Sequence, residues 1–175
     1  RCRLRMTTLT SVSSSGATVF NHNVYLKDMK HTTLRGNIFA RGSNFGTKLS
    51  SDKPGGFTDF VVENNLYYNN GIDLSHSSGP TGDIQTTFTH DRGLIRDNVF
   101  TEAGRTFAAG NKQDLAAWLM NSRDVEWAAN LFVHKPLFSG HATLMWGGHH
   151  KNISMHDTVV YDWNIRPDVP EASYL

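Results

Sequence analysis

The chain has 175 residues, of which 19% are charged and 11% aromatic, a composition typical of one folded domain and not of a disordered segment. The formal net charge of +1 gives no reason to expect a nucleic-acid or membrane partner. The sequence contains no run of about 18 apolar residues, the length that a helix needs to cross a bilayer. The single cysteine, Cys2, excludes an internal disulfide.

Three regions follow one another along the chain. Residues 1–19 have a basic start and a serine-rich stretch, and we interpret them as a linker, a cap or an incomplete structural unit. Residues 20–164 are repetitive, and residues 165–175, which include Pro167 and Pro170, form a tail. Because the chain begins at Arg1 without an initiator methionine, we expect it to be a piece of a longer protein.

The repetitive region contains one short pattern five times, namely a β-type run, a corner residue and a second β-type run. The corner residues, which are separated by 28, 33, 32 and 28 positions, are Asn37, Asn65, Asn98, Asn130 and Thr158. A period of this length indicates stacked structural units. Asparagine suits a sharp bend because it tolerates the left-handed backbone region and because its amide can bond backbone groups or a stacked asparagine.

This pattern resembles the asparagine ladder of right-handed parallel β-helices, the fold of pectate lyase-like polysaccharide enzymes. The resemblance covers about residues 20–164. It implies an all-β solenoid of about five coils that is a fragment of a longer helix. The same fold also serves tailspikes and adhesins, so the resemblance is more specific for the fold than for the function.

A third β-type run lies between successive copies of the pattern, at residues 23–27, 46–50, 71–75, 116–120 and 144–148. Side chains alternate across a strand, so four leucines are expected to point inward: Leu26, Leu49, Leu74 and Leu119. The side chains between them are expected to form a solvent-facing column: Tyr25, Lys48, Asp73, Trp118 and Trp146.

The run before the corner residue gives an independent test of this alternation. Three positions before each corner the residue is apolar, as in Leu34, Val62, Ile95, Trp127 and Met155. The residues that follow these positions include Arg35, Glu63 and Arg96, whose charges alternate in sign on adjacent strands and therefore favour pairing.

The solvent-facing column is the candidate functional site. Its aromatic residues, Trp118 and Trp146 above all, suit the apolar faces of sugar rings. Lys48 beside Asp73 could neutralise a sugar carboxylate or abstract a proton. The resemblance to β-helix lyases implies Lys48 as the base and His22, His76 or Tyr25 as the acid. The alternative interpretation is a surface ion pair with little energetic effect.

The sequence contains no metal-binding motif of regular spacing. Carboxylates on adjacent coils could hold a calcium ion, as in some β-helix lyases, and the candidates are Glu63, Asp73, Asp91 and Asp97. Four late histidines could meet at one corner, but no zinc-binding spacing is present: His141, His149, His150 and His156. We therefore assign no metal ligands, and the cofactor stays unknown.

The sequence favours a secreted or periplasmic polysaccharide lyase that cleaves an acidic, uronic-acid-containing polymer such as alginate or pectin. The elimination needs a base, an acid and a positive group on the carboxylate, and Lys48 alone cannot supply all three. A glycoside hydrolase is a rival, although it needs two carboxylates and the column has only Asp73. A non-catalytic carbohydrate-binding, adhesin or tailspike-like segment is the other rival.

Overall fold

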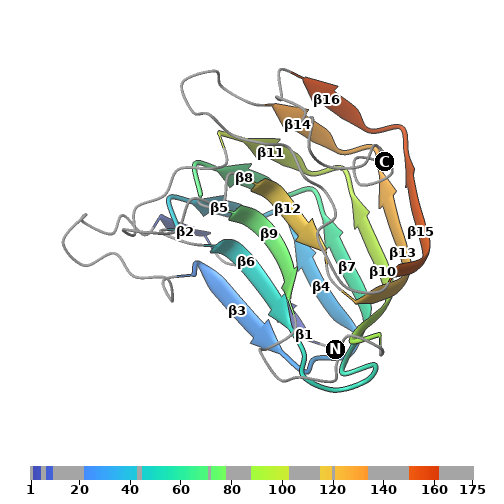
Figure 1. Ribbon diagram of the computed structural model, residues 1–175. Coiled ribbons are helices and arrows are strands. Elements are labelled where there is room, and N and C mark those ends of the chain that lie inside the picture. The colour runs from blue at the N-terminus through green and yellow to red at the C-terminus, as the bar shows by residue number, and fades with distance from the viewer. Residues whose placement is uncertain are drawn as a thin grey trace.

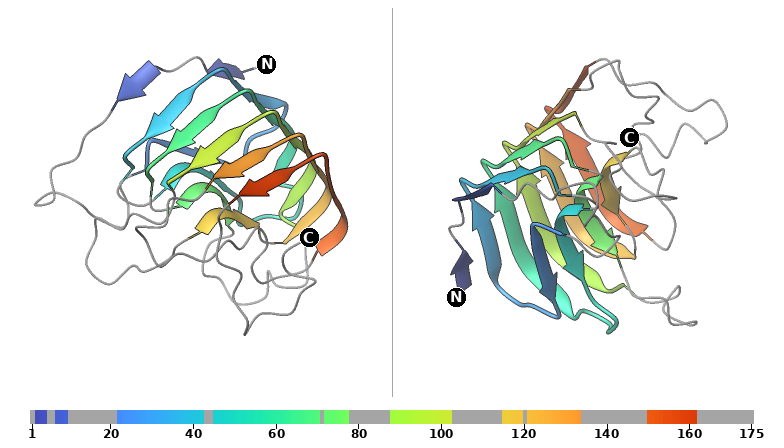
Figure 2. Two further views of the ribbon diagram at one scale, coloured as in Figure 1. Left: turned by 90° about the horizontal axis from the view of Figure 1, so that it is seen from above. Right: turned by 90° about the vertical axis from the view of Figure 1, so that its left-hand side faces the viewer.

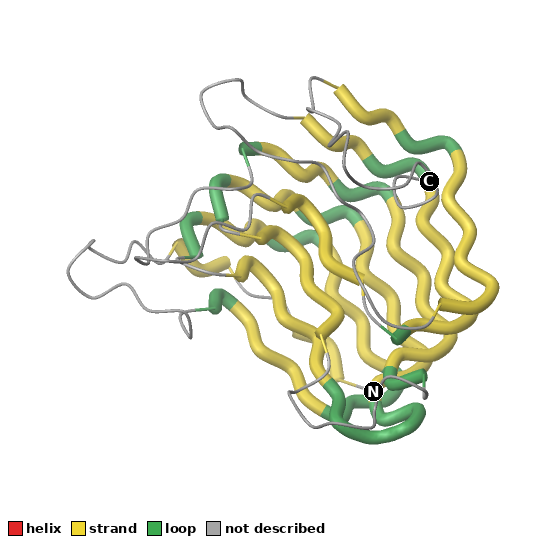
Figure 3. Tube along the Cα trace, viewed as in Figure 1, coloured by secondary structure: helices red, strands yellow, loops and turns green. Residues whose placement is uncertain are grey.

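The computed structural model describes residues 2–4, 7–9, 22–42, 45–70, 72–77, 88–102, 115–119, 121–133 and 150–161. For residues 2–4, 7–9 and 72–77, and for Leu115 and Trp118, only the backbone is described. Strands, turns and loops make up all of these ranges, and no helix occurs in them (Figure 3). The described part of the chain therefore also holds no helix that is long and apolar enough to cross a membrane. The protein is all-β, as the sequence predicts.

The strands form three parallel sheets (Figure 1). Sheet A has the order β1 (Cys2–Leu4), β4 (Thr32–Arg35), β7 (Phe57–Glu63), β10 (His90–Arg96), β13 (Ser122–Ala128) and β15 (His150–His156). Sheet B has the order β2 (Thr7–Leu9), β5 (Ile38–Ala40), β8 (Leu66–Tyr68), β11 (Val99–Thr101), β14 (Leu131–Val133) and β16 (Val159–Tyr161). Sheet C has the order β3 (Val24–Lys27), β6 (Phe45–Ser50), β9 (Ile72–Ser77) and β12 (Leu115–Leu119).

The chain visits the sheets in a fixed order. From β3 to β14 it passes through sheet C, sheet A and sheet B on every turn, and each strand pairs in parallel with the equivalent strand of the next turn (Figures 1 and 2). Residues 2–4 and 7–9 already belong to sheets A and B, where they pair with β4 and β5. The predicted strand at 144–148 and the tail from 165 lie outside the described residues.

The predicted asparagine ladder is confirmed at the corner between sheets A and B. The side-chain Nδ2 of each asparagine donates to the Oδ1 of the next at 3.0 Å, from Asn37 to Asn65, from Asn65 to Asn98 and from Asn98 to Asn130. The same Oδ1 atoms accept backbone N–H bonds of 3.0–3.1 Å from the preceding turn. The second Nδ2 proton goes to a backbone carbonyl, for example from Asn98 to Val62 at 2.9 Å.

The reason for asparagine at this corner differs in one respect from the prediction. The left-handed backbone conformation belongs to the residue before each ladder position, with φ between 51° and 66°, as in Gly36, Asn64, Asp97, Ala129 and Asp157. Asparagine is thus required for its amide, which both donates and accepts along the stack, and not for its tolerance of positive φ.

A second asparagine plays the same role at the corner between sheets B and C. The Oδ1 of Asn70, which is fully buried, accepts a 2.7 Å bond from the backbone N–H of Gly42, and its Nδ2 donates to the carbonyl of Phe39 at 2.9 Å. These bonds reproduce the pattern of Asn65, which also bonds a backbone N–H 28 residues earlier and the carbonyl three residues before that group.

The core lies between the three sheets and contains stacked aromatic rings. In sheet B the rings of Phe39, Tyr67, Phe100 and Phe132 follow one another with centroids 4.6–4.9 Å apart. In sheet A the apolar positions predicted to point inward are buried to 2% exposure or less at Leu34, Val62, Ile95 and Trp127. Met155, on the last strand of the sheet, is partly buried against this core.

The outer face of sheet A carries the predicted charge alternation. Glu63 is 2% exposed and bonds the guanidinium groups of Arg35 and Arg96, which lie on the strands to either side. Burial alone would raise the pKa of Glu63, but the two guanidinium groups outweigh it and the pKa is lowered. Asp91, also buried, is held in the same way by Arg92 and Arg123.

Candidate functional site

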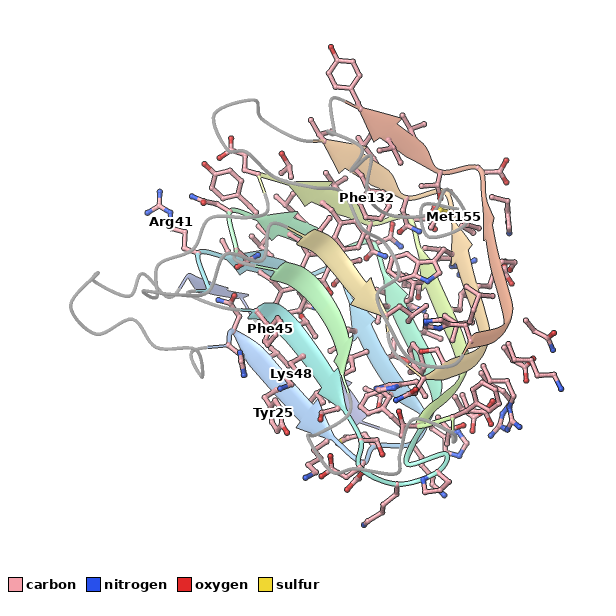
Figure 4. All side chains as sticks on the ribbon, in the orientation of Figure 1. Tyr25, Arg41, Phe45, Lys48, Phe132 and Met155 are labelled. Carbon is pink, nitrogen blue, oxygen red and sulfur yellow. The ribbon has the colours of Figure 1, made fainter. Side chains whose placement is uncertain are left out.

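The candidate site lies on the first two strands of sheet C. Tyr25 of β3 stands directly opposite Lys48 of β6, as the sequence predicts. Tyr25 is 48% exposed and Lys48 is partly exposed, so both side chains reach the surface. Figure 4 shows these two side chains together with Phe45 on the neighbouring strands β3 and β6.

Four side chains meet at this place and form the His22 cluster: His22, Tyr25, Phe45 and Lys48. The Nζ atom of Lys48 lies 5.5 Å from the ring centroid of Tyr25 and 5.3 Å from that of Phe45, so the ammonium is in contact with two aromatic faces. The His22 ring stacks on Tyr25 at 5.7 Å and is tilted against Phe45 at 4.9 Å.

His22 has an unusual electrostatic environment. Burial of its ring and, as a smaller cause, the positive charge of Lys48 lower its pKa from 6.5 to about 4. At neutral pH the imidazole is therefore uncharged. Its Nδ1 atom is buried and forms no hydrogen bond with the described residues.

The expected neighbour relation between Lys48 and Asp73 is wrong. The register pairs Lys48 with Ser75, while Leu74, one residue after Asp73, pairs with Thr47. Asp73 lies two residues before Ser75, which is about 7 Å along a strand. Lys48 and Asp73 are therefore not a directly opposed pair on adjacent strands.

The pairing of β9 with β6, which differs by two residues from the predicted register, also changes the expected stack of leucines. Leu49 and Leu119 are buried as predicted and Leu26 is partly buried, but the residue between Leu49 and Leu119 in the register is His76 and not Leu74. The backbone of His76 thus pairs with Leu49 and Leu119, one register position away from the pair of Lys48 and Ser75. This placement gives no support to His76 as an acid beside Lys48.

The remaining predicted residues of the column are placed only in part. The backbone of Trp118 pairs with Ser75, so Trp118 belongs to the column that runs through Tyr25 and Lys48. The side chains of Trp118 and Asp73 are not described, and Trp146 lies outside the described residues.

The described side chains among the calcium candidates do not form one set. Glu63 and Asp91 are each bonded to two arginines at separate places on sheet A. No group of three or more His, Cys, Asp or Glu side chains suited to a metal occurs in the described part of the chain. Of the late histidines, His150 and His156 lie at opposite ends of β15, and the other two are outside the described ranges.

Phe45 is the member of the His22 cluster that the sequence interpretation missed. The predicted strand began one residue later, at Gly46, whereas β6 begins at Phe45. Alternation across β6 gave no signal for it, because alternation groups Phe45 with the buried Thr47 and Leu49 and not with Lys48, which its ring contacts. The cluster as a whole offers a cation, an exposed aromatic face with a hydroxyl group, and a neutral imidazole.

Comparison of the chain with protein-family models, with curated proteins and with solved structures found no match.

Proposed function

We propose that the protein is a right-handed parallel β-helix that binds a uronic-acid-containing polysaccharide on the outer face of sheet C and cleaves it by β-elimination. The fold part of this proposal is supported by the parallel sheets, visited in fixed order, and by the asparagine ladder. The functional part depends on one observation, the convergence of His22, Tyr25 and Lys48 at the surface.

Each polar side chain of the cluster matches one requirement of the reaction. The Lys48 ammonium pairs with the carboxylate of the sugar and stabilises the charge that develops when the neighbouring C5 proton leaves. The His22 imidazole accepts that proton, and the electron pair forms the C4–C5 double bond while the C4–O bond breaks. Tyr25 donates a proton to the departing oxygen and stacks its ring on the sugar.

The electrostatics of His22 couple substrate binding to base strength. With a pKa of about 4 the free imidazole is available but is a weak base. A uronate carboxylate that pairs with Lys48 offsets one of the two causes of the lowered pKa and places a negative charge near the ring. Binding therefore raises the pKa of His22 and makes it a stronger base when substrate is present.

The reaction is tested by incubating the protein with alginate and pectin and following the ultraviolet absorbance of the unsaturated product. His22→Ala should lower turnover by about 100-fold or more with little change in affinity, because proton transfer acts on the transition state. Tyr25→Phe, which keeps the ring, should act in the same way. Lys48→Gln should weaken binding as well, whereas the exposed Lys151→Gln on sheet A should change neither quantity.

A non-catalytic carbohydrate-binding segment is the second candidate. It is favoured by the buried Nδ1 of His22, which has no described partner to orient the ring in the way that catalytic bases usually require. An intact protein that binds uronate polymers, loses affinity in the Tyr25→Ala variant and forms no unsaturated product would establish this candidate. Absence of both binding and elimination on every uronate polymer would contradict both.

A further inference from the structure

The outer face of sheet B differs in chemistry from the rest of the described surface. Five strands, β5, β8, β11, β14 and β16, lie side by side in sheet B (Figure 2, left). By alternation along each strand, its first and third residues are on the side away from the stacked rings of the core. The register arranges these side chains in two columns, Ile38, Leu66, Val99, Leu131 and Val159, and Ala40, Tyr68, Thr101, Val133 and Tyr161. None of the ten is charged. They are called the sheet B face below.

The sheet B face is exposed to solvent over most of its length. Ile38 is 45% exposed, Leu131 36%, Val159 57% and Tyr161 65%, and Leu66 and Val99 are partly exposed. Ala40, at the β5 end of the second column, is buried. Sheet A, in contrast, covers its outer face with paired charges such as those of Glu63 with two arginines. With these exposed fractions, the nine exposed side chains offer on the order of 600 Å² of uncharged surface, the size of the largest patches on ordinary monomers.

Polar groups border this face on both sides. Arg41 and Glu102 lie at the end of the strands that leads to sheet C, and Figure 4 shows the Arg41 side chain extending away from β5. Asp97 and Asp157, both exposed, lie at the corner with sheet A. An uncharged centre with a polar border is the usual arrangement of a protein interface.

We propose that the sheet B face is the interface of a homodimer, in which the same face of a second copy packs against it. A flat face of regular strands is complementary to itself under a two-fold axis, and two sheets can pack at about 10 Å with their strands nearly aligned. Two copies would together bury about 1,200 Å², the lower end of the range for specific interfaces. The face carries no cation, so the acidic polymer proposed for sheet C finds no charge partner here.

Interfaces near this lower limit are typical of weak, transient association. We therefore expect a dissociation constant in the micromolar range. Sedimentation equilibrium of the intact chain from about 1 µM to about 200 µM should therefore show a reversible monomer–dimer transition. A chain that stays monomeric over this range overturns the proposal, and so does a closed oligomer other than a dimer.

Two substitutions locate the interface independently of each other. Ile38→Arg and Leu131→Arg each place a charge at an outward position of the sheet B face, and each should weaken the dimer at least tenfold because a buried, unpaired charge is costly. Leu94→Arg is the matched control, since Leu94 is an outward-facing leucine of sheet A opposite Val61 and Glu126. It should leave the dissociation constant unchanged.

The thermal melt of each variant shows whether it is folded, and two sites are used so that a single unfolded variant does not decide the outcome. Folded Ile38→Arg or Leu131→Arg protein that still dimerises as the unmodified chain does would overturn the assignment of the interface. Loss of the dimer in Leu94→Arg to the same extent would overturn it as well, because the effect would then not depend on the face that carries the charge.

Discussion

Replacing Asn98 by alanine tests whether the asparagine ladder stabilises the fold. Asn98 is 1% exposed and takes part in four side-chain hydrogen bonds. Its Oδ1 accepts from the backbone N–H and from the Nδ2 of Asn65, both at 3.0 Å, and its Nδ2 donates to Asn130 and to the carbonyl of Val62. The Asn98→Ala variant removes all four at once in the middle of the stack.

The size of the effect follows from the groups that lose a partner. Two donors of Asn65, its backbone N–H and one side-chain N–H, lose their acceptor inside the protein. An unsatisfied buried donor costs about 1–3 kcal/mol, so the free energy of unfolding should fall by about 2–6 kcal/mol. The Oδ1 of Asn130 keeps the 3.1 Å bond from the backbone N–H of residue 98, which limits the loss on that side.

The assay is urea unfolding followed by tryptophan fluorescence, which the four tryptophans of the chain make possible. Thr158→Ala at the last position of the same corner is the control, because its hydroxyl makes one bond of 3.1 Å, to the carbonyl of His156, at a partly exposed site. The control should lose less than about 1 kcal/mol. An Asn98→Ala variant as stable as this control would refute the reasoning, since the buried amide would then contribute nothing.

Two further predictions concern packing and pH. A Cβ at position 93 would lie 2.1 Å from the ring of Phe60, so Gly93→Ala should lower the free energy of unfolding by about 1–3 kcal/mol. The loss should be smaller in a Phe60→Leu background, which a double-mutant cycle of urea unfolding would show. Both ring nitrogens of His156 bond carboxylates, Asp157 at 2.9 Å and Glu126 at 3.1 Å, and these bonds raise its pKa. The charged ring therefore adds stability at pH values below the ordinary pKa of 6.5, and this contribution is lost as the pH rises through the higher pKa of the folded state. The melting temperature of the unmodified chain should exceed that of His156→Gln at about pH 5. A difference in melting temperature that does not narrow by about pH 9 would contradict this prediction.

Sheets A and B could be predicted from the sequence because their residues keep a constant distance from the ladder. The inward residue of sheet A always lies three positions before the asparagine, and the stacked ring of sheet B lies two positions after it, as with Trp127 and Phe132 around Asn130. The ladder bonds fix the backbone on both sides of the corner, so alternation alone places every neighbouring side chain.

Sheet C has no such fixed distance, and this explains the error at the candidate site. Lys48 lies eleven residues after Asn37, but its partner Ser75 lies ten after Asn65. Segments of different length separate sheets B and C, so alternation along the strand leaves the register open by steps of two. Asp73 and Ser75 are two residues apart, so alternation cannot choose between them as the partner of Lys48, and only the backbone pairing does.

The variable spacing between sheets B and C also explains why the residues of the proposed site lie on sheet C. The hydrogen-bonded corner between sheets A and B, where each asparagine repeats the bonds of the last, must keep its spacing in every turn, because a shifted asparagine would leave buried amide groups without partners. Between sheets B and C the described residues show such bonds at Asn70 and at Asn23, whose Nδ2 donates to the carbonyl of Ala40, and the number of residues between the two sheets differs from turn to turn. Side chains that differ from one turn to the next, such as His22, Tyr25 and Lys48, therefore lie on and beside sheet C, next to the variable segments, and we expect the functional residues there.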